Sequence, residues 1–75
     1  MKLKDCPKHI LLRIISVDIS DAKLKLRLYE IGMFKGSIIQ LLNSSFLKKT
    51  MLVQVLDSCF AVKSNVADNI EVEYV

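Results

Sequence analysis

Few residues in this chain have side chains suited to metal binding or catalysis, and they are widely spaced. The single histidine, His9, stands three positions after Cys6, a spacing that can place two metal ligands side by side. A structural zinc site needs four protein ligands, and the sequence offers no second pair at a matching spacing. We therefore interpret Cys6 and His9 as an isolated thiol and imidazole, and we expect no metal site and no bound cofactor.

Catalytic constellations are equally hard to assemble. A Ser/His/Asp or Cys/His arrangement would have to recruit His9 from the N-terminal segment, and no paired carboxylates lie in an apolar setting. The segment Gly32–Gly36 is not a phosphate-binding loop of the Walker type, because Lys35 precedes the second glycine. The sequence therefore indicates a protein that is not an enzyme.

Composition limits the protein to one small domain. The chain has 75 residues, of which 52% are hydrophobic, so it is expected to fold around a core of marginal size. No apolar run approaches the roughly 18 residues that span a bilayer, and Arg13 interrupts the only stretch that resembles a signal peptide. We expect a cytoplasmic protein, without membrane insertion, whose two cysteines are free thiols.

The net charge of +3 is unevenly distributed. The first fifty residues carry ten Lys/Arg against four acids, whereas residues 51–75 carry one lysine against four acids. A basic face of this kind binds nucleic acid, an acidic protein surface or anionic lipid, or it is simply solvated. The residues that we expect on one side are Lys23, Lys25, Arg27, Lys35, Lys48 and Lys49.

Five segments have the residue types and alternation of strands. In the first of them, Ile15 and Val17 are predicted to face the core, and in the last, Ile70 and Val72 alternate with glutamates. The inward positions predicted for the middle strands are Ile39, Leu41, Val53 and Val55. The five predicted strands are Ile10–Val17, Ser37–Leu42, Met51–Leu56, Cys59–Lys63 and Ile70–Tyr74.

The connecting segments have turn and loop compositions. Residues 1–8 are predicted to be a loose arm, and residues 43–50 an exposed loop in which Phe46 is either a lid over the core or a contact residue. Asp57 and Ser58 are expected to form the turn between the third and fourth of these segments. Ser64 is predicted to cap one helical turn in which Ala67 is buried.

Residues 22–31 give conflicting signals. Leucines alternate with basic residues there, which favours a strand, whereas the residue types are strong helix formers. Ser20 or Asp21 can cap a helix at its start, and Gly32 can end it in a Schellman-type stop followed by a tight turn over residues 34–37. We favour a helix, with Leu24, Leu28 and Ile31 facing the sheet and Ala22, Leu26 and Tyr29 on another side.

This corner resembles the helix-to-strand signature of the FeoA family, small bacterial proteins of ferrous iron transport, which reads L-x-E-[LI]-G-[LMF]-x-x-G. The matching residues are Leu28, Glu30, Ile31, Gly32, Met33, Lys35 and Gly36. The segment Phe60–Lys63, Ala67 and the segment Ile70–Glu73 are similar to the closing part of that family. The resemblance covers about the last fifty residues well.

Membership of that family implies a fold and a partner. The implied fold is mainly β with one to two short helices: a small SH3-like barrel of about five antiparallel strands, with a helix inserted after the first strand. The implied partner is the cytoplasmic part of the membrane transporter FeoB, which would recruit the protein to the inner face of the membrane and whose activity it would modulate. The expected contact residues are Lys25, Leu26, Arg27, Tyr29, Met33, Phe34 and Lys35, arranged around a structural corner at Gly32 and Gly36.

Alternatives remain open from the sequence. Leu26 and Tyr29 either form this docking patch or pack beneath the N-terminal arm or a loop. A small basic barrel can bind nucleic acid by stacking bases on Phe46 or Tyr29 beside Lys48 and Lys49, although the chain has few aromatic residues. The chain can also be a stand-alone relative of the FeoA-like domains of metal-responsive repressors. Direct iron binding is disfavoured, because the carboxylates of residues 57, 68, 71 and 73 have no evident convergence.

Overall fold

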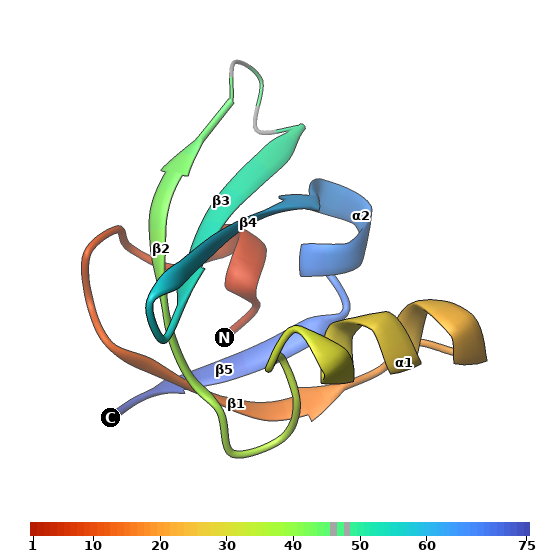
Figure 1. Ribbon diagram of the computed structural model, residues 1–75. Helices are drawn as coiled ribbons and strands as arrows, with labels where there is room; N and C mark the ends of the chain where they lie inside the picture. The colour runs from red at the N-terminus through yellow and green to blue at the C-terminus, as the bar shows by residue number, and fades with distance from the viewer. Residues whose placement is uncertain (46, 48) are drawn as a thin grey trace.

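A computed structural model of the chain shows a strongly bent sheet flanked by short helices (Figure 1). It describes residues 1–45, 47 and 49–75. The predictions for Phe46 and Lys48 therefore lie outside the described residues. In chain order the elements are η1 (Leu3–Asp5, a 3-10 turn), β1 (Leu12–Val17), α1 (Ala22–Glu30), β2 (Ile38–Ser44), β3 (Thr50–Val55), β4 (Ser58–Lys63), α2 (Ser64–Ala67) and β5 (Ile70–Tyr74).

The strands lie in the order β4-β3-β2-β1-β5, and neighbouring strands in the described sheet are antiparallel. A mainly β fold with a helix after the first strand is thus confirmed. The predicted closure into a complete barrel is wrong, because no pairing joins the edge strands β4 and β5 within the described residues. The chain passes from β4 directly into α2, and this helix stands between the two edges (Figure 1).

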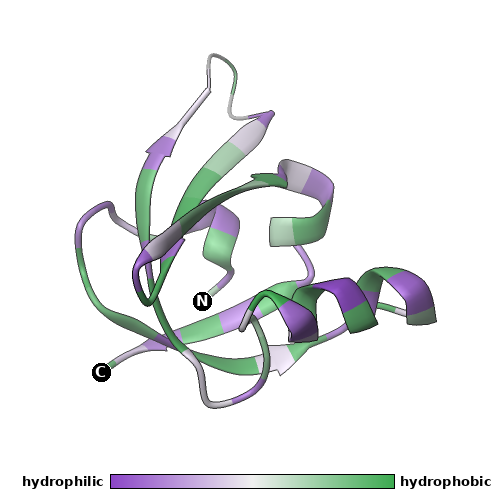
Figure 2. Cartoon of the chain, in the orientation of Figure 1, coloured by the Kyte–Doolittle hydropathy of each residue, from purple (hydrophilic) through white to green (hydrophobic). Residues whose placement is uncertain are grey.

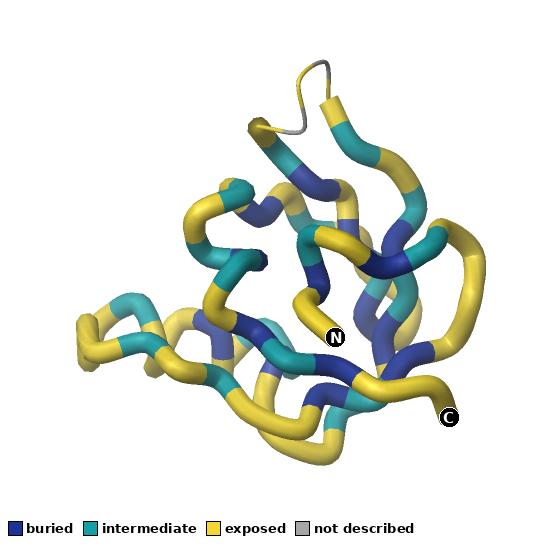
Figure 3. Tube along the Cα trace, turned by 180° about the vertical axis from the view of Figure 1, so that it is seen from behind, coloured by how far each residue is buried: buried dark blue, intermediate teal, exposed yellow. Residues whose placement is uncertain are grey.

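Apolar residues are frequent along the strands (Figure 2). All five strands contribute residues to the core, and the buried positions lie in the middle of the fold (Figure 3). The predicted inward positions of β2, β3 and β5 are confirmed, and so is the burial of Ala67. Tyr74 is exposed at the end of β5. Residues buried on the strands are Leu12, Ile14, Ile39, Leu41, Met51, Val53, Val55, Val62, Ile70 and Val72.

The prediction for β1 is half wrong, and a β-bulge explains why. Ile14 pairs with Val72 and Ser16 with Glu71, so Ile15 is an extra residue with no partner on β5. An extra residue shifts the alternation of faces along a strand. Ile14 is therefore buried before the bulge and Val17 packs against the core after it, while Ile15 itself is exposed.

Residues 1–8 are not a loose arm. Leu3 is fully buried, and the Val72 N–H donates to the Met1 carbonyl at 2.7 Å. The N-terminal ammonium group contacts the Glu71 carboxylate at 3.0 Å. The short 3-10 turn thus places the Leu3 side chain in the core, which its charged neighbours in the sequence do not predict.

Helix α1 begins and ends as predicted. The Asp21 carboxylate accepts the N–H groups of Lys23 and Leu24 at 3.0 and 3.3 Å. At the other end Gly32 has φ +96°, its N–H donates to Tyr29, and the Met33 N–H donates to the Leu28 carbonyl at 2.8 Å. These two hydrogen bonds define a Schellman motif.

The predicted tight turn after the helix is also confirmed. The Ser37 N–H donates to the Phe34 carbonyl at 2.9 Å, and Gly36 has φ +95°. The Gly36 N–H then donates to the Ile14 carbonyl at 2.7 Å, and the Ile14 N–H donates to the Ser37 carbonyl at 2.9 Å. The corner is thereby fastened to β1 before the chain enters β2.

Two local predictions for the C-terminal half are wrong. The β3–β4 turn is formed by Leu56, whose φ is 54°, and Asp57, and not by Asp57 and Ser58. Ser64 does not cap α2, because it is the first helical residue and the capping position is Lys63, whose side chain makes no capping hydrogen bond. Strand β3 ends at Val55, one residue before its predicted end, whereas β4 ends at Lys63 as predicted.

The two cysteines should differ sharply in reactivity. Both are free thiols, as expected, but Cys6 is buried and Cys59 is exposed. Burial raises the pKa of the Cys6 thiol; its backbone hydrogen bond lowers this pKa and the Asp5 carboxylate raises it. Because the thiolate is the reactive form, iodoacetamide at about pH 8 should modify Cys6 at least about tenfold more slowly than Cys59. Single-cysteine variants followed by mass spectrometry measure both rates, and equal rates in the native protein would contradict the buried position.

Alanine substitution at the two glycines of the corner should have unequal effects. Both positions carry a positive φ, which costs a non-glycine residue about 1–2 kcal/mol. At Gly32 a Cβ would also lie 3.0 Å from the Val55 Cγ1, whereas at Gly36 it would meet nothing within 4 Å. Gly32→Ala should therefore lower the free energy of unfolding more than Gly36→Ala in urea titrations. The opposite order would show that the contact with β3 is unimportant.

Candidate docking surface

The outer side of α1 carries an exposed apolar cluster. Leu26 is 57% exposed, Tyr29 62% and Phe34 40%. The rings of Tyr29 and Phe34 lie against each other, with centroids 4.9 Å apart and planes tilted by 38°, a typical geometry for an aromatic pair. The corner turns the chain back, so that an aromatic residue beyond the helix lies beside one in its last turn. Because Leu26 and Tyr29 are both more than half exposed, they do not pack beneath the N-terminal arm or a loop.

Basic residues lie on the same helix and corner as this cluster. Lys25 and Arg27 lie on the exposed part of α1, and Lys35 lies in the corner. The ion pairs found among the described residues join Met1 to Glu71, Lys2 to Asp68 and Arg13 to Glu73. Lys25, Arg27 and Lys35 therefore have no ion-pair partner within the described chain. Their charges are available to an acidic partner surface.

The sequence predicts that the basic residues share one face, and this prediction is wrong. Lys49 belongs to the β2–β3 connection, which lies at the opposite end of the molecule from α1 (Figure 1). Lys23, Lys25, Arg27 and Lys35 remain together on α1 and its corner. Charge segregation along a sequence does not place residues on one side of a fold, because successive loops of a bent sheet point to opposite ends.

Met33 is predicted to contact a partner, but it is buried and cannot do so. Its side chain is 1% exposed and belongs to the core. The apolar residue after a Schellman glycine folds back onto the last turn of the helix, and here it packs into the core with Leu28. We define the docking patch as the remaining six residues: Lys25, Leu26, Arg27, Tyr29, Phe34 and Lys35.

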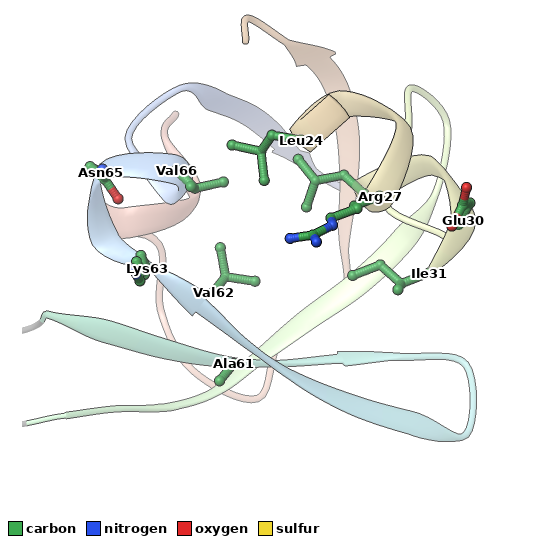
Figure 4. A pocket seen from close by; sticks show the side chains of 10 residues that line it. Leu24, Arg27, Glu30, Ile31, Ala61, Val62, Lys63, Asn65 and Val66 are labelled. Atoms are coloured by element: carbon green, nitrogen blue, oxygen red, sulfur yellow. The ribbon is translucent and has the colours of Figure 1, made fainter. Parts of the chain in front are cut away.

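A second feature, which the sequence did not indicate, is a cleft of about 620 Å³ between α1 and the β4–α2 segment (Figure 4). Leu24, Val62 and Val66 point into it, and Val62 forms part of its buried floor. The stripe predicted to face the sheet does so, but Leu24 and Ile31 are only half-buried. The cleft is lined by Leu24, Arg27, Leu28, Glu30, Ile31, Ala61, Val62, Lys63, Asn65 and Val66.

The thiol and the imidazole of the N-terminal segment lie in different surroundings. Cys6 donates a hydrogen bond from its thiol to the Leu3 carbonyl at 3.0 Å, and His9 is exposed. Within the described residues no three His, Cys, Asp or Glu side chains are grouped so that they could hold a metal ion. None of the helices in that part of the chain has the length and apolar character needed to cross a membrane.

Similar folds occur in solved structures. Iron(II) transport protein A from Clostridium thermocellum is 25% identical with a TM-score of 0.90, and the match covers all of this chain but only 46% of that one. FeoA from Stenotrophomonas maltophilia, a prokaryotic SH3 domain protein crystallised with zinc, is 26% identical with a TM-score of 0.80, over 97% of this chain and 89% of that one. A manganese-dependent transcriptional repressor, 16% identical, has the same fold with a TM-score of 0.87, over all of this chain and 41% of that one.

The fold is that of a small SH3-like domain, and its surface carries the exposed cluster of Leu26, Tyr29 and Phe34. A family model described as the FeoA domain matches residues 1–74. The chain belongs to the FeoA family, which is associated with ferrous iron transport. Among curated proteins none matches the chain.

The two sides of α1 should respond differently to substitution. Leu26→Asp changes an exposed side chain, so the free energy of unfolding should stay within about 0.5 kcal/mol of the wild type. Leu28→Ala removes a buried side chain and should lower it by about 2–5 kcal/mol. Urea titration followed by circular dichroism measures both changes. A large loss of stability in Leu26→Asp would mean that this leucine packs within the fold.

Proposed function

We propose that this protein is an accessory protein of ferrous iron uptake that docks on the cytoplasmic part of the transporter FeoB and modulates its activity. The observation that supports the proposal best is the aromatic pair of Tyr29 and Phe34, held on the surface beside cations without an ion-pair partner in the described chain. Membership of the FeoA family supports the choice of partner.

The patch has the composition of an interface centre. Large apolar side chains contribute most of the binding energy at protein interfaces, and a rigid pair of rings loses little conformational freedom on binding. Leu26 extends the aromatic pair along the helix. The surrounding Lys25, Arg27 and Lys35 would attract an acidic surface and increase the association rate more than the affinity.

Modulation follows from differential binding. A ligand shifts a conformational equilibrium only by the difference in its affinity for the two states. If the patch fits one state of the transporter better, docking favours that state and changes GTP turnover or gating. Residence in the cytoplasm, with recruitment to the inner face of the membrane, is part of the same proposal.

The repressor-like and nucleic-acid alternatives have weaker support. The likeness to the manganese-dependent repressor concerns the fold, and this chain spans 41% of that protein. Base stacking of the predicted kind needs an aromatic ring beside Lys49. Tyr29 lies on α1 and Lys49 on the β2–β3 connection, at opposite ends of the molecule (Figure 1). Oligonucleotide binding that weakens steeply with salt would favour this alternative instead.

Substitutions in the patch should weaken binding to FeoB without unfolding the protein. We expect the double variant Leu26→Asp/Tyr29→Ala to bind the purified cytoplasmic part of FeoB at least about tenfold more weakly than the wild type, because it loses two central apolar contacts. Biolayer interferometry at fixed salt measures both affinities. Retention of wild-type affinity would exclude this patch as the docking surface.

The matched control is Leu47→Asp. Leu47 is 70% exposed and belongs to the β2–β3 connection, far from α1. Its φ of 64° also suits aspartate better than leucine. This variant should bind as tightly as the wild type. An equal loss in both variants would indicate a nonspecific effect of added negative charge.

A further inference from the structure

We propose that the cleft between α1 and β4 is a second binding site, which takes an extended peptide segment of a partner protein by adding a strand to the open edge of β4. The segment would have alternating apolar and acidic residues. This site is separate from the docking patch, with which it shares only Arg27 at its rim.

The edge of β4 has backbone groups directed away from the sheet. Leu56 and Asp57 form a two-residue turn between the paired residues Val55 and Ser58, and such a pair is hydrogen-bonded. Every second residue along β4, beginning with Ser58, is therefore hydrogen-bonded to β3. The Ser64 N–H, which donates to the Lys49 carbonyl at 2.9 Å, fits the same spacing. The intervening residues point their N–H groups outwards.

These outward groups have no strand partner. Strand β4 lies at the edge of the described sheet and pairs there with β3, so no strand faces the N–H groups of Cys59, Ala61 and Lys63 or the carbonyls of Cys59 and Ala61. An unpaired edge is a template for another strand. Ala61 and Lys63 also line the cleft, so the open edge and the apolar hollow belong to one site.

The cleft determines which side chains the added strand should carry. Residues opposite each other in a sheet have their side chains on the same face. Peptide residues opposite Val62 would point into the cleft, between Leu24 and Val66, and should be apolar. Residues opposite Ala61 and Lys63 would lie on the outer face, where the Lys63 ammonium favours a carboxylate.

The rim charges support an acidic occupant. Arg27 and Lys63 lie on opposite walls, and Glu30 is the one acid among the lining residues, so the lining carries a net charge of +1. None of the lining residues is aromatic, and proline-rich peptides bind in aromatic-lined grooves. The cleft runs between α1 on one side and the β4–α2 segment on the other (Figure 4).

The test is a titration of the ¹⁵N-labelled protein with a capped peptide of alternating valine and glutamate. Saturable shifts should appear at the amides of Cys59, Ala61 and Lys63. We propose that the peptide runs antiparallel to β4, so in this register the glutamate N–H groups face β4 and the valine N–H groups face away. N-methylation of the glutamate amides should therefore weaken binding at least about tenfold, while N-methylation of the valine amides should leave it nearly unchanged.

A variant tests the same contact from the protein side. Ala61→Pro removes an outward N–H without breaking a bond to β3, and proline is tolerated at such edge positions. It should lose peptide binding while keeping the wild-type melting temperature, and Ala61→Val, which keeps the N–H, should retain binding. If Ala61→Pro fails to fold, the methylated peptides still decide the question with the wild-type chain.

Several results would overturn the proposal. These are the absence of saturable shifts, shifts located away from β4, equal effects of the two methylation patterns, or a preference for a proline-rich peptide. Self-association that Ala61→Pro abolishes would show that a second copy occupies the edge instead. Because Leu26→Asp/Tyr29→Ala does not touch β4, its effect on FeoB binding is independent of all these outcomes.

Discussion

The left-handed backbone at Gly32 is the constraint on which the rest of the structure depends. A residue at φ +96° ends α1, and the lack of a Cβ lets this corner approach Val55 on β3. The same turn sends Met33 into the core and brings Phe34 back beside Tyr29. One backbone conformation thereby fixes the helix against the sheet and creates the aromatic pair on the surface.

The open sheet has an equally direct physical origin. Strands β4 and β5 are joined by α2, whose few residues keep the two edges apart, so the described sheet bends without closing. Leu3, from the N-terminal turn, fills part of the space inside. At β4 the gap leaves backbone hydrogen-bonding groups beside an apolar cleft. A domain of this size can thus offer a binding edge without enlarging its core.

Helix α1 separates two surfaces of different character. Its outer side presents Leu26 and Tyr29 with flanking cations, which suits a folded partner surface. Its inner side lies only loosely over the sheet, with Leu24 and Ile31 half-buried along the cleft. A short amphipathic helix that is not fully buried therefore gives a small domain two different surfaces, which we propose as its binding sites.

Local chemistry in the sequence determined the elements: the Asp21 cap, the Gly32 stop and the alternation of β2, β3 and β5 depend on neighbouring residues alone. The tertiary structure decided what depends on distant partners. The bulge at Ile15 exists only opposite β5. The burial of Leu3 and Met33 depends on a core built by all the strands. Lys49 lies away from α1 because the loops of a bent sheet point in different directions (Figure 1). The cleft beside β4 likewise arises between lining residues of α1 and β4 that are thirty or more positions apart in the chain, so no local pattern reveals it.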